Sequence, residues 1–151
     1  MSTMQPGHGS YLLPSLDHAT VADAMHPGIL ACDPDAPITE VARMMATHHV
    51  HCIVVMGISQ EQQAGESLVW GIISDLELVR AGIRSGGEQT AKEIALEPIA
   101  MVDPTTPLRQ VAELMATHGA SHVVVANRDT QRPVGMISTL DIAGVLAWGE
   151  A

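Results

Sequence analysis

The chain has 151 residues, of which 46% are hydrophobic, and it carries a formal net charge of −10. This acidic balance argues against nucleic acid and anionic membrane surfaces as partners, because both require a basic face on the protein. The length fits one domain or two small units that share a core. With no Phe in the sequence, that core must be built from aliphatic side chains and Met.

The sequence favours a cytoplasmic protein. No apolar run approaches the roughly 18 residues of a membrane span, and the N-terminus lacks the charged and apolar regions of a signal peptide. The two cysteines, Cys32 and Cys52, form no Cys-x-x-Cys motif. This usage is typical of buried thiols in a reducing compartment.

The first half of the chain alternates between helical and extended patterns. Residues 1–17 are aperiodic, and we expect them to form a flexible tail. The elements expected after the tail are a short helix at 20–25, a strand at 29–32, a turn at 33–37, an amphipathic helix at 38–49, strands at 53–56 and 69–73 around a polar loop, and a helix at 75–83.

The second half repeats this order. Residues 33–55 and 103–125 match at a constant offset of 70, and 11 of these 23 positions are identical. A fixed offset of this kind indicates a tandem repeat. Expected elements therefore recur at 90–94, 99–102, 108–118 and 123–125, and we divide the chain into the tail, repeat 1 at 18–85 and repeat 2 at 86–151.

Each repeat closes with a short strand that runs into a helix. The second copy reads Gly135-Met136-Ile137-Ser138-Thr139-Leu140-Asp141, and the first copy, starting at Gly71, has Glu77 in place of Asp141. Unpaired N–H groups at a helix start favour oxygen-rich ligands, and a carboxylate there can accept both hydroxyls of a vicinal diol. The same spacing also fits a capping box with no ligand.

The duplicated unit, with its Asp-Pro turns, its Val54-Val55 and Val124-Val125 pairs and its Gly-x-x-Ser motifs, resembles a tandem pair of CBS (cystathionine β-synthase-type) domains. The resemblance covers about residues 20–148. It implies a mixed α/β (α+β) fold of two β-α-β-β-α repeats, packed about a pseudo-two-fold axis into one module. It also implies homodimers, no catalysis, and regulation of a partner by adenosine-containing ligands: AMP, ADP, ATP, NAD(H) or S-adenosylmethionine.

The resemblance further implies two clefts, each formed by the closing motif of one repeat and the first two strands of the other. The first cleft would use Ser138, Thr139, Asp141, Ile29, Leu30, Val50, His51 and Cys52. The second cleft would use Ser74, Asp75, Glu77, Ile99, Ala100, Ala120, Ser121 and His122. Glu77 departs from the family's Asp by one methylene, which favours the Asp141 cleft, and Val54 and Val124 stand where the family often has Pro.

The scarcity of basic residues favours a ligand of low charge, AMP or S-adenosylmethionine, over ATP. No Gly-x-Ser-x-Gly motif or other nucleophile pattern indicates an enzyme. With no second domain in the sequence to regulate, we expect an unknown protein partner that is acted on in trans. Two alternatives remain open: a structural dimerisation module that binds no nucleotide, and a metal site at His48, His49, His51 and Cys52.

Overall fold

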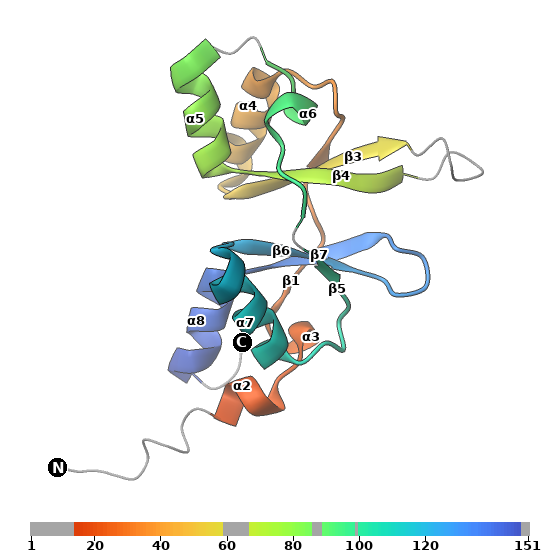
Figure 1. Ribbon diagram of the computed structural model, residues 1–151, viewed down its shortest axis with the longest axis vertical. Helices are drawn as coiled ribbons and strands as arrows, with labels where there is room; N and C mark the ends of the chain where they lie inside the picture. The colour runs from red at the N-terminus through yellow and green to blue at the C-terminus, as the bar shows by residue number, and fades with distance from the viewer. Residues whose placement is uncertain (1–13, 59–66, 86–88, 99, 149–151) are drawn as a thin grey trace, which may run out of the picture. The chain divides into compact units, whose positions relative to one another are not determined.

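The structure is a computed structural model that describes residues 14–58, 67–85, 89–98 and 100–148. It divides into two compact units: unit 1 comprises Met1–Gly28 and Ile99–Ala151, and unit 2 comprises Ile29–Pro98. In each unit the helices cover one face of a single sheet (Figure 1). Among the described residues, no helix is long and apolar enough to cross a membrane.

Unit 2 contains a three-stranded sheet of order β2-β3-β4. Its strands are β2 (Ala31–Cys32), β3 (Cys52–Ile58) and β4 (Ser67–Ser74), with β2 parallel and β4 antiparallel to β3. Its helices are α4 (Ile38–His48), α5 (Asp75–Ser85) and α6 (Ala91–Ile94). The apolar stripe of α4 packs on alternate residues of β3, so that Val41, Met45, Ile53 and Val55 share one buried core.

Unit 1 repeats this plan with one additional strand. Its four-stranded sheet has the order β1-β7-β6-β5, formed by β1 (His26–Pro27), β5 (Met101–Val102), β6 (His122–Ala126) and β7 (Pro133–Ser138). The helices are α2 (Pro14–His18), α3 (Val21–Ala24), α7 (Leu108–His118) and α8 (Thr139–Trp148). Val111, Met115, Val123, Val125 and Ile137 form its core in the same way.

The first segment of each sequence repeat packs in the unit built from the other repeat. Helix α3 lies at the start of repeat 1, yet Val21 N–H donates to the carbonyl of Thr106 at 2.9 Å. Helix α6 lies at the start of repeat 2, yet Ala91 N–H donates to the carbonyl of Ala36 at 2.8 Å. The predicted boundaries at 18–85 and 86–151 follow the repeat in sequence, whereas the compact units exchange these opening segments.

The exchanged segments explain the glycines of the two closing motifs. A Cβ on Gly135 would lie 2.5 Å from the carbonyl oxygen of His26, and a Cβ on Gly71 would lie 2.8 Å from that of Leu96. Both contacts are with backbone, which side-chain rotation cannot relieve. Glycine is therefore required at these positions by the close approach of a crossing strand.

Most expected elements are present, with differences at their ends. Helix α7 has the predicted bounds, whereas β2 and β5 have only two residues each. Two elements were not expected: β1, and helix α2 inside the segment predicted to be a tail. Helix α2 forms because Leu16 packs against the core of unit 1 and Arg109 Nε donates to the Asp17 carboxylate.

Candidate ligand sites at two helix starts

The carboxylate of Asp141 lies at the start of α8 and closes a capping box with Ser138. The Ser138 backbone N–H and Oγ both donate to Asp141 Oδ2, at 2.8 and 3.0 Å. In return the Asp141 N–H donates to Ser138 Oγ at 3.2 Å. The capping box that the spacing allowed is therefore present, and its hydrogen bonds fix the position of the carboxylate.

The second oxygen of this carboxylate is occupied by a histidine that the sequence analysis did not include. His26 Nδ1 lies 2.9 Å from Asp141 Oδ1, and the two side chains are 75% and 7% exposed, respectively. The imidazole comes from β1, which pairs with β7 so that His26 faces Met136. No local sequence signal marks this histidine, because its contact with Asp141 depends on the pairing of β1 with β7.

Glu77 occupies the matching place at the start of α5. Ser74 N–H and Oγ donate to Glu77 Oε1 at 2.8 and 2.5 Å. The extra methylene therefore does not prevent the longer side chain from folding back onto the strand end. Both Ser74 bonds use the same oxygen, as both Ser138 bonds do in the other unit.

Within each unit, the closing motif contacts strand residues that were predicted for the opposite cleft. In unit 2, His51 Nδ1 lies 2.8 Å from Asp75 Oδ2, and Cys52 pairs with Ser74 across the sheet. In unit 1, Thr139 N–H donates to the Ser121 carbonyl at 3.0 Å, and His122 pairs with Ser138. The crossed grouping of the two clefts remains a prediction.

The remaining predicted site residues flank these strands. Ile29, Leu30 and Val50 belong to unit 2 and are half-buried, and Ala100 and Ala120 belong to unit 1 and are also half-buried. Ile99 lies outside the described residues.

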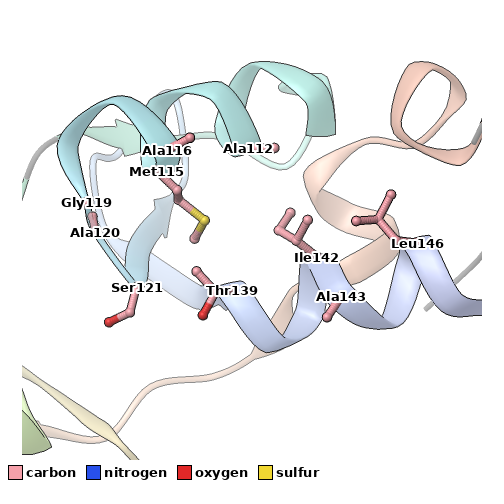
Figure 2. A pocket seen from close by; sticks show the side chains of 10 residues that line it. All are labelled: Ala112, Met115, Ala116, Gly119, Ala120, Ser121, Thr139, Ile142, Ala143 and Leu146. Atoms are coloured by element: carbon pink, nitrogen blue, oxygen red, sulfur yellow. The ribbon is translucent and has the colours of Figure 1, made fainter.

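A groove of about 480 Å³ runs between α7 and α8 in unit 1 (Figure 2). The hydroxyl-bearing residues Ser121 and Thr139 line it together with eight apolar or small residues: Ala112, Met115, Ala116, Gly119, Ala120, Ile142, Ala143 and Leu146. Its lining is mainly apolar, which suits an apolar side chain better than a phosphate.

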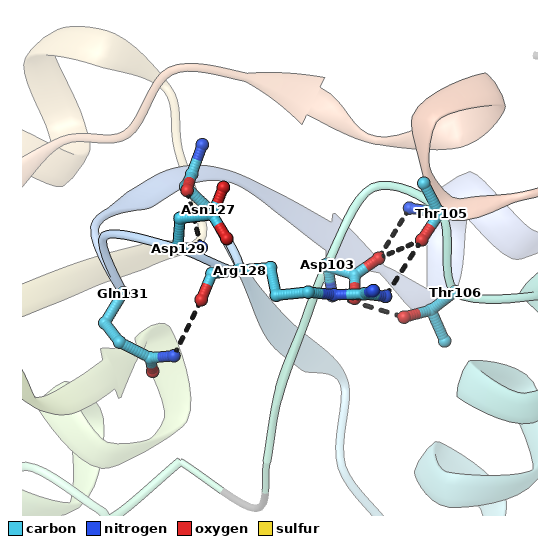
Figure 3. A network of polar contacts seen from close by, with 7 residues as sticks. All are labelled: Asp103, Thr105, Thr106, Asn127, Arg128, Asp129 and Gln131. Carbon is cyan, nitrogen blue, oxygen red and sulfur yellow. Dashed lines mark hydrogen bonds and ion pairs between the residues drawn. The ribbon is translucent and has the colours of Figure 1, made fainter.

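A separate polar network joins the turn after β5 to the turn between β6 and β7 (Figure 3). Arg128 Nε and Nη2 donate to Asp103 Oδ2 at 3.1 and 2.7 Å, while Thr105 N–H donates to Oδ1 at 2.7 Å. The hydrogen bonds from Thr105 and then Arg128 lower the pKa of Asp103 to about 2. This network commits one of the few basic side chains to a carboxylate.

The alternative metal site is not formed. Among the described residues, which include all four candidates, no three His, Cys, Asp or Glu side chains are grouped so that they could hold an ion. His49 ends α4 in the left-handed conformation, with φ of 54°. Burial, reinforced by the charges of Glu77 and Asp75, raises the pKa of the Cys52 thiol to about 12, which opposes the thiolate that a metal requires.

The CBS domain family model matches the chain twice, at residues 21–84 and 91–147. The chain belongs to the CBS domain family. The family assignment drawn from the motifs is confirmed. A comparison with curated proteins found no match.

Solved CBS structures share the fold of this CBS-domain chain. The CBS domain pair of protein MJ0100, in complex with 5′-methylthioadenosine and S-adenosyl-L-methionine, has a TM-score of 0.72 and 20% identity, covering 85% of this chain and 96% of that chain. An uncharacterized conserved protein from Pyrococcus horikoshii has a TM-score of 0.69 and 22% identity, with coverage of 84% and 91%. Hypoxic Response Protein I with two coordinated zinc ions has a TM-score of 0.65 and 23% identity, with coverage of 83% and 98%. These likenesses confirm the mixed α/β fold of a CBS domain pair.

Proposed function

We propose that this protein is a regulatory module, without catalysis of its own, that binds an adenosine-containing ligand and acts on a protein partner in trans. The observation that carries the proposal is the carboxylate positioned by Ser at each helix start. In both units one oxygen accepts both Ser donors, so a ligand hydroxyl would be received at the other oxygen, which His26 contacts in the case of Asp141.

The complex of the similar MJ0100 domain pair supports the ligand class. Both of its ligands, 5′-methylthioadenosine and S-adenosyl-L-methionine, contain adenosine. Adenosine has a ribose with a vicinal diol, which is the group that a carboxylate fixed by a strand end can recognise. Binding can regulate a partner only if the ligand prefers one conformation of the protein over another.

The distribution of basic side chains favours a ligand of low charge. Lys92, Arg109 and Arg128 are each paired with a carboxylate, those of Asp35, Asp17 and Asp103, respectively. These pairs commit three of the seven basic residues to carboxylates, so fewer remain to contact a triphosphate. AMP or S-adenosylmethionine therefore fits better than ATP.

The test is a thermal-shift series with AMP, ATP, NADH and S-adenosylmethionine. At least one compound should raise Tm, and combining Asp141→Asn with Glu77→Gln should remove the shift. The matched control combines Asp23→Asn with Glu93→Gln. These carboxylates form the same kind of capping box, with Thr20 and Thr90, at helices that do not follow a closing motif. An equal loss in the control variant, or no shift with any compound, contradicts the proposal.

A second proposal, supported by the exposed faces of α8 and α5, is that two copies of the chain associate. Leu140 and Trp148 on α8 are 76% and 83% exposed, and α8 contains a single charged residue. Helices that are apolar on all sides are normally covered. Leu76 on α5 is also exposed and aligns with Leu140, so each unit presents an apolar side chain at this helix position. Two copies can bury such a patch by pairing it with itself about a two-fold axis.

Sedimentation equilibrium tests this association. The wild type should have twice the chain mass, and Leu140→Asp should be monomeric, whereas Ala22→Asp on the exposed side of α3 should leave the dimer unchanged. A monomeric wild type contradicts the homodimer. A dimer in a protein that no adenosine compound stabilises would favour the purely structural alternative.

A further inference from the structure

The two carboxylate sites differ in one neighbour. His26 pairs with Met136 in unit 1, and Leu96 forms the matching bridge with Ile72 in unit 2. The carbonyl oxygens of both residues make the closest approach to the motif glycine, so His26 and Leu96 are structurally equivalent. In unit 1 an imidazole therefore contacts the carboxylate, whereas the equivalent position in unit 2 is a leucine, which cannot donate a hydrogen bond.

The presence or absence of the imidazole changes how many hydrogen bonds each carboxylate can still accept from a ligand. A carboxylate accepts about four hydrogen bonds, two at each oxygen. Asp141 uses both positions of Oδ2 for Ser138 and one position of Oδ1 for His26, which leaves about one position. Glu77 uses Oε1 for Ser74, and within the described part of the chain no hydrogen bond to Oε2 is observed.

A diol that donates both hydroxyls to the second oxygen can therefore be accepted at Glu77 with no bond broken. At Asp141 it must first displace the His26 N–H. The imidazole is largely exposed, so it is free to rotate outward, but its contact with a carboxylate that is 7% exposed opposes the displacement. His26 competes only with the ligand diol, because the bonds from Ser138 to Oδ2 are the same whether or not the imidazole is displaced.

We infer that His26 is a specificity-determining residue that competes with the ligand diol for Asp141, so that a diol ligand fills the Glu77 site before the Asp141 site. This inference rests on the proposed adenosine-binding function. It also reverses the order expected from the sequence, where the shorter carboxylate favoured the Asp141 site.

Calorimetric titration of single sites tests this order. In a Glu77→Gln background, where the Asp141 site is isolated, His26→Leu should tighten AMP binding by about two- to tenfold, the range for one hydrogen bond. 2′,3′-Dideoxyadenosine monophosphate, which lacks the diol, should bind both proteins equally. In an Asp141→Asn background, the reciprocal Leu96→His should weaken AMP binding by a similar factor.

A measurement without ligand tests the contact itself. Nitrogen-15 NMR of the His26 ring should show a protonated Nδ1 in the wild type, and this signal should change in Asp141→Asn, because the carboxylate holds that tautomer.

The outcomes separate the inference from the proposed function. AMP binding that depends on Asp141 but is unchanged by His26→Leu overturns the inference and leaves the function standing, as does a His26 ring without the Nδ1 proton. A gain that is equal for AMP and the dideoxy analogue also overturns the inference, because it shows a steric effect only. No binding of AMP to any variant overturns both.

Discussion

Replacing Gly135 by Ala tests whether the closing motif is shaped by the strand that crosses it. The new Cβ would lie 2.5 Å from the His26 carbonyl oxygen, almost 1 Å inside an ordinary carbon–oxygen contact. Because the partner is backbone, β1 must move away from β7. Overpacking of this kind costs about 1–3 kcal/mol of unfolding free energy.

The chain provides two comparisons for this variant. Gly71→Ala brings its Cβ to 2.8 Å from the Leu96 oxygen, so its loss should be smaller than that of Gly135→Ala. Gly144→Ala on α8 meets nothing within 4 Å and should gain about 0.5–1 kcal/mol, because Ala is the better helix former. The substitution in the helix and the two substitutions in the strands are therefore predicted to change stability with opposite sign.

Urea denaturation followed by circular dichroism gives the free energies of unfolding of the wild type and the three variants. The account predicts the stability order Gly144→Ala, wild type, Gly71→Ala and Gly135→Ala, from most to least stable. If Gly135→Ala is as stable as the wild type, β1 does not pack against β7 as described, and the placement of His26 beside Asp141 loses its basis.

Three further predictions concern caps and charge. Asp141→Ala should lower the free energy of unfolding by about 1 kcal/mol through loss of the capping box, while Asp141→Asn should lose less; equal losses in chemical denaturation would refute the capping role. His49→Gly should raise stability by about 0.5–1 kcal/mol and Gly119→Ala should lower it, because both positions have positive φ; thermal denaturation of the pair reports both signs. Asp103 has a pKa of about 2 in the folded protein and about 3.9 when unfolded, so its stabilising effect is complete above that unfolded value and is lost as pH falls towards 2. The stability difference between wild type and Asp103→Asn should therefore shrink between about pH 4 and 2, and a difference that is constant over this window would refute the network.

The elements predicted best are those whose pattern is local. Helix α7 has the expected bounds because its apolar positions recur at helical spacing between Pro107 and Gly119. Strand β1 was missed because two residues cannot show a period, and it exists only through its pairing with β7. The exchange of opening segments was missed for the same reason, since a repeat in sequence does not say which unit its first segment joins.

In the candidate site, too, the local features were predicted and the contacts between residues distant in sequence were not. The spacing of Ser138 and Asp141 identified both the capping box and the carboxylate, because both depend on residues three apart. His26 is remote from Asp141 in sequence and lies next to it only because β1 pairs with β7. In the described part of the chain the four residues of the metal alternative are not grouped, because His48 and His49 end a helix while Cys52 begins a strand.

The central claim is that a ligand diol is received at the Ser-positioned carboxylates of both units. The most direct measurement is an amide NMR titration of the wild type with the adenosine compound that gives the largest thermal shift. The account predicts that the Ser74 and Ser138 amides, which donate to Glu77 and Asp141, shift most and saturate, with Ser74 saturating first. Shifts confined to the exposed face of α8, or no saturating shift at either serine, would contradict it.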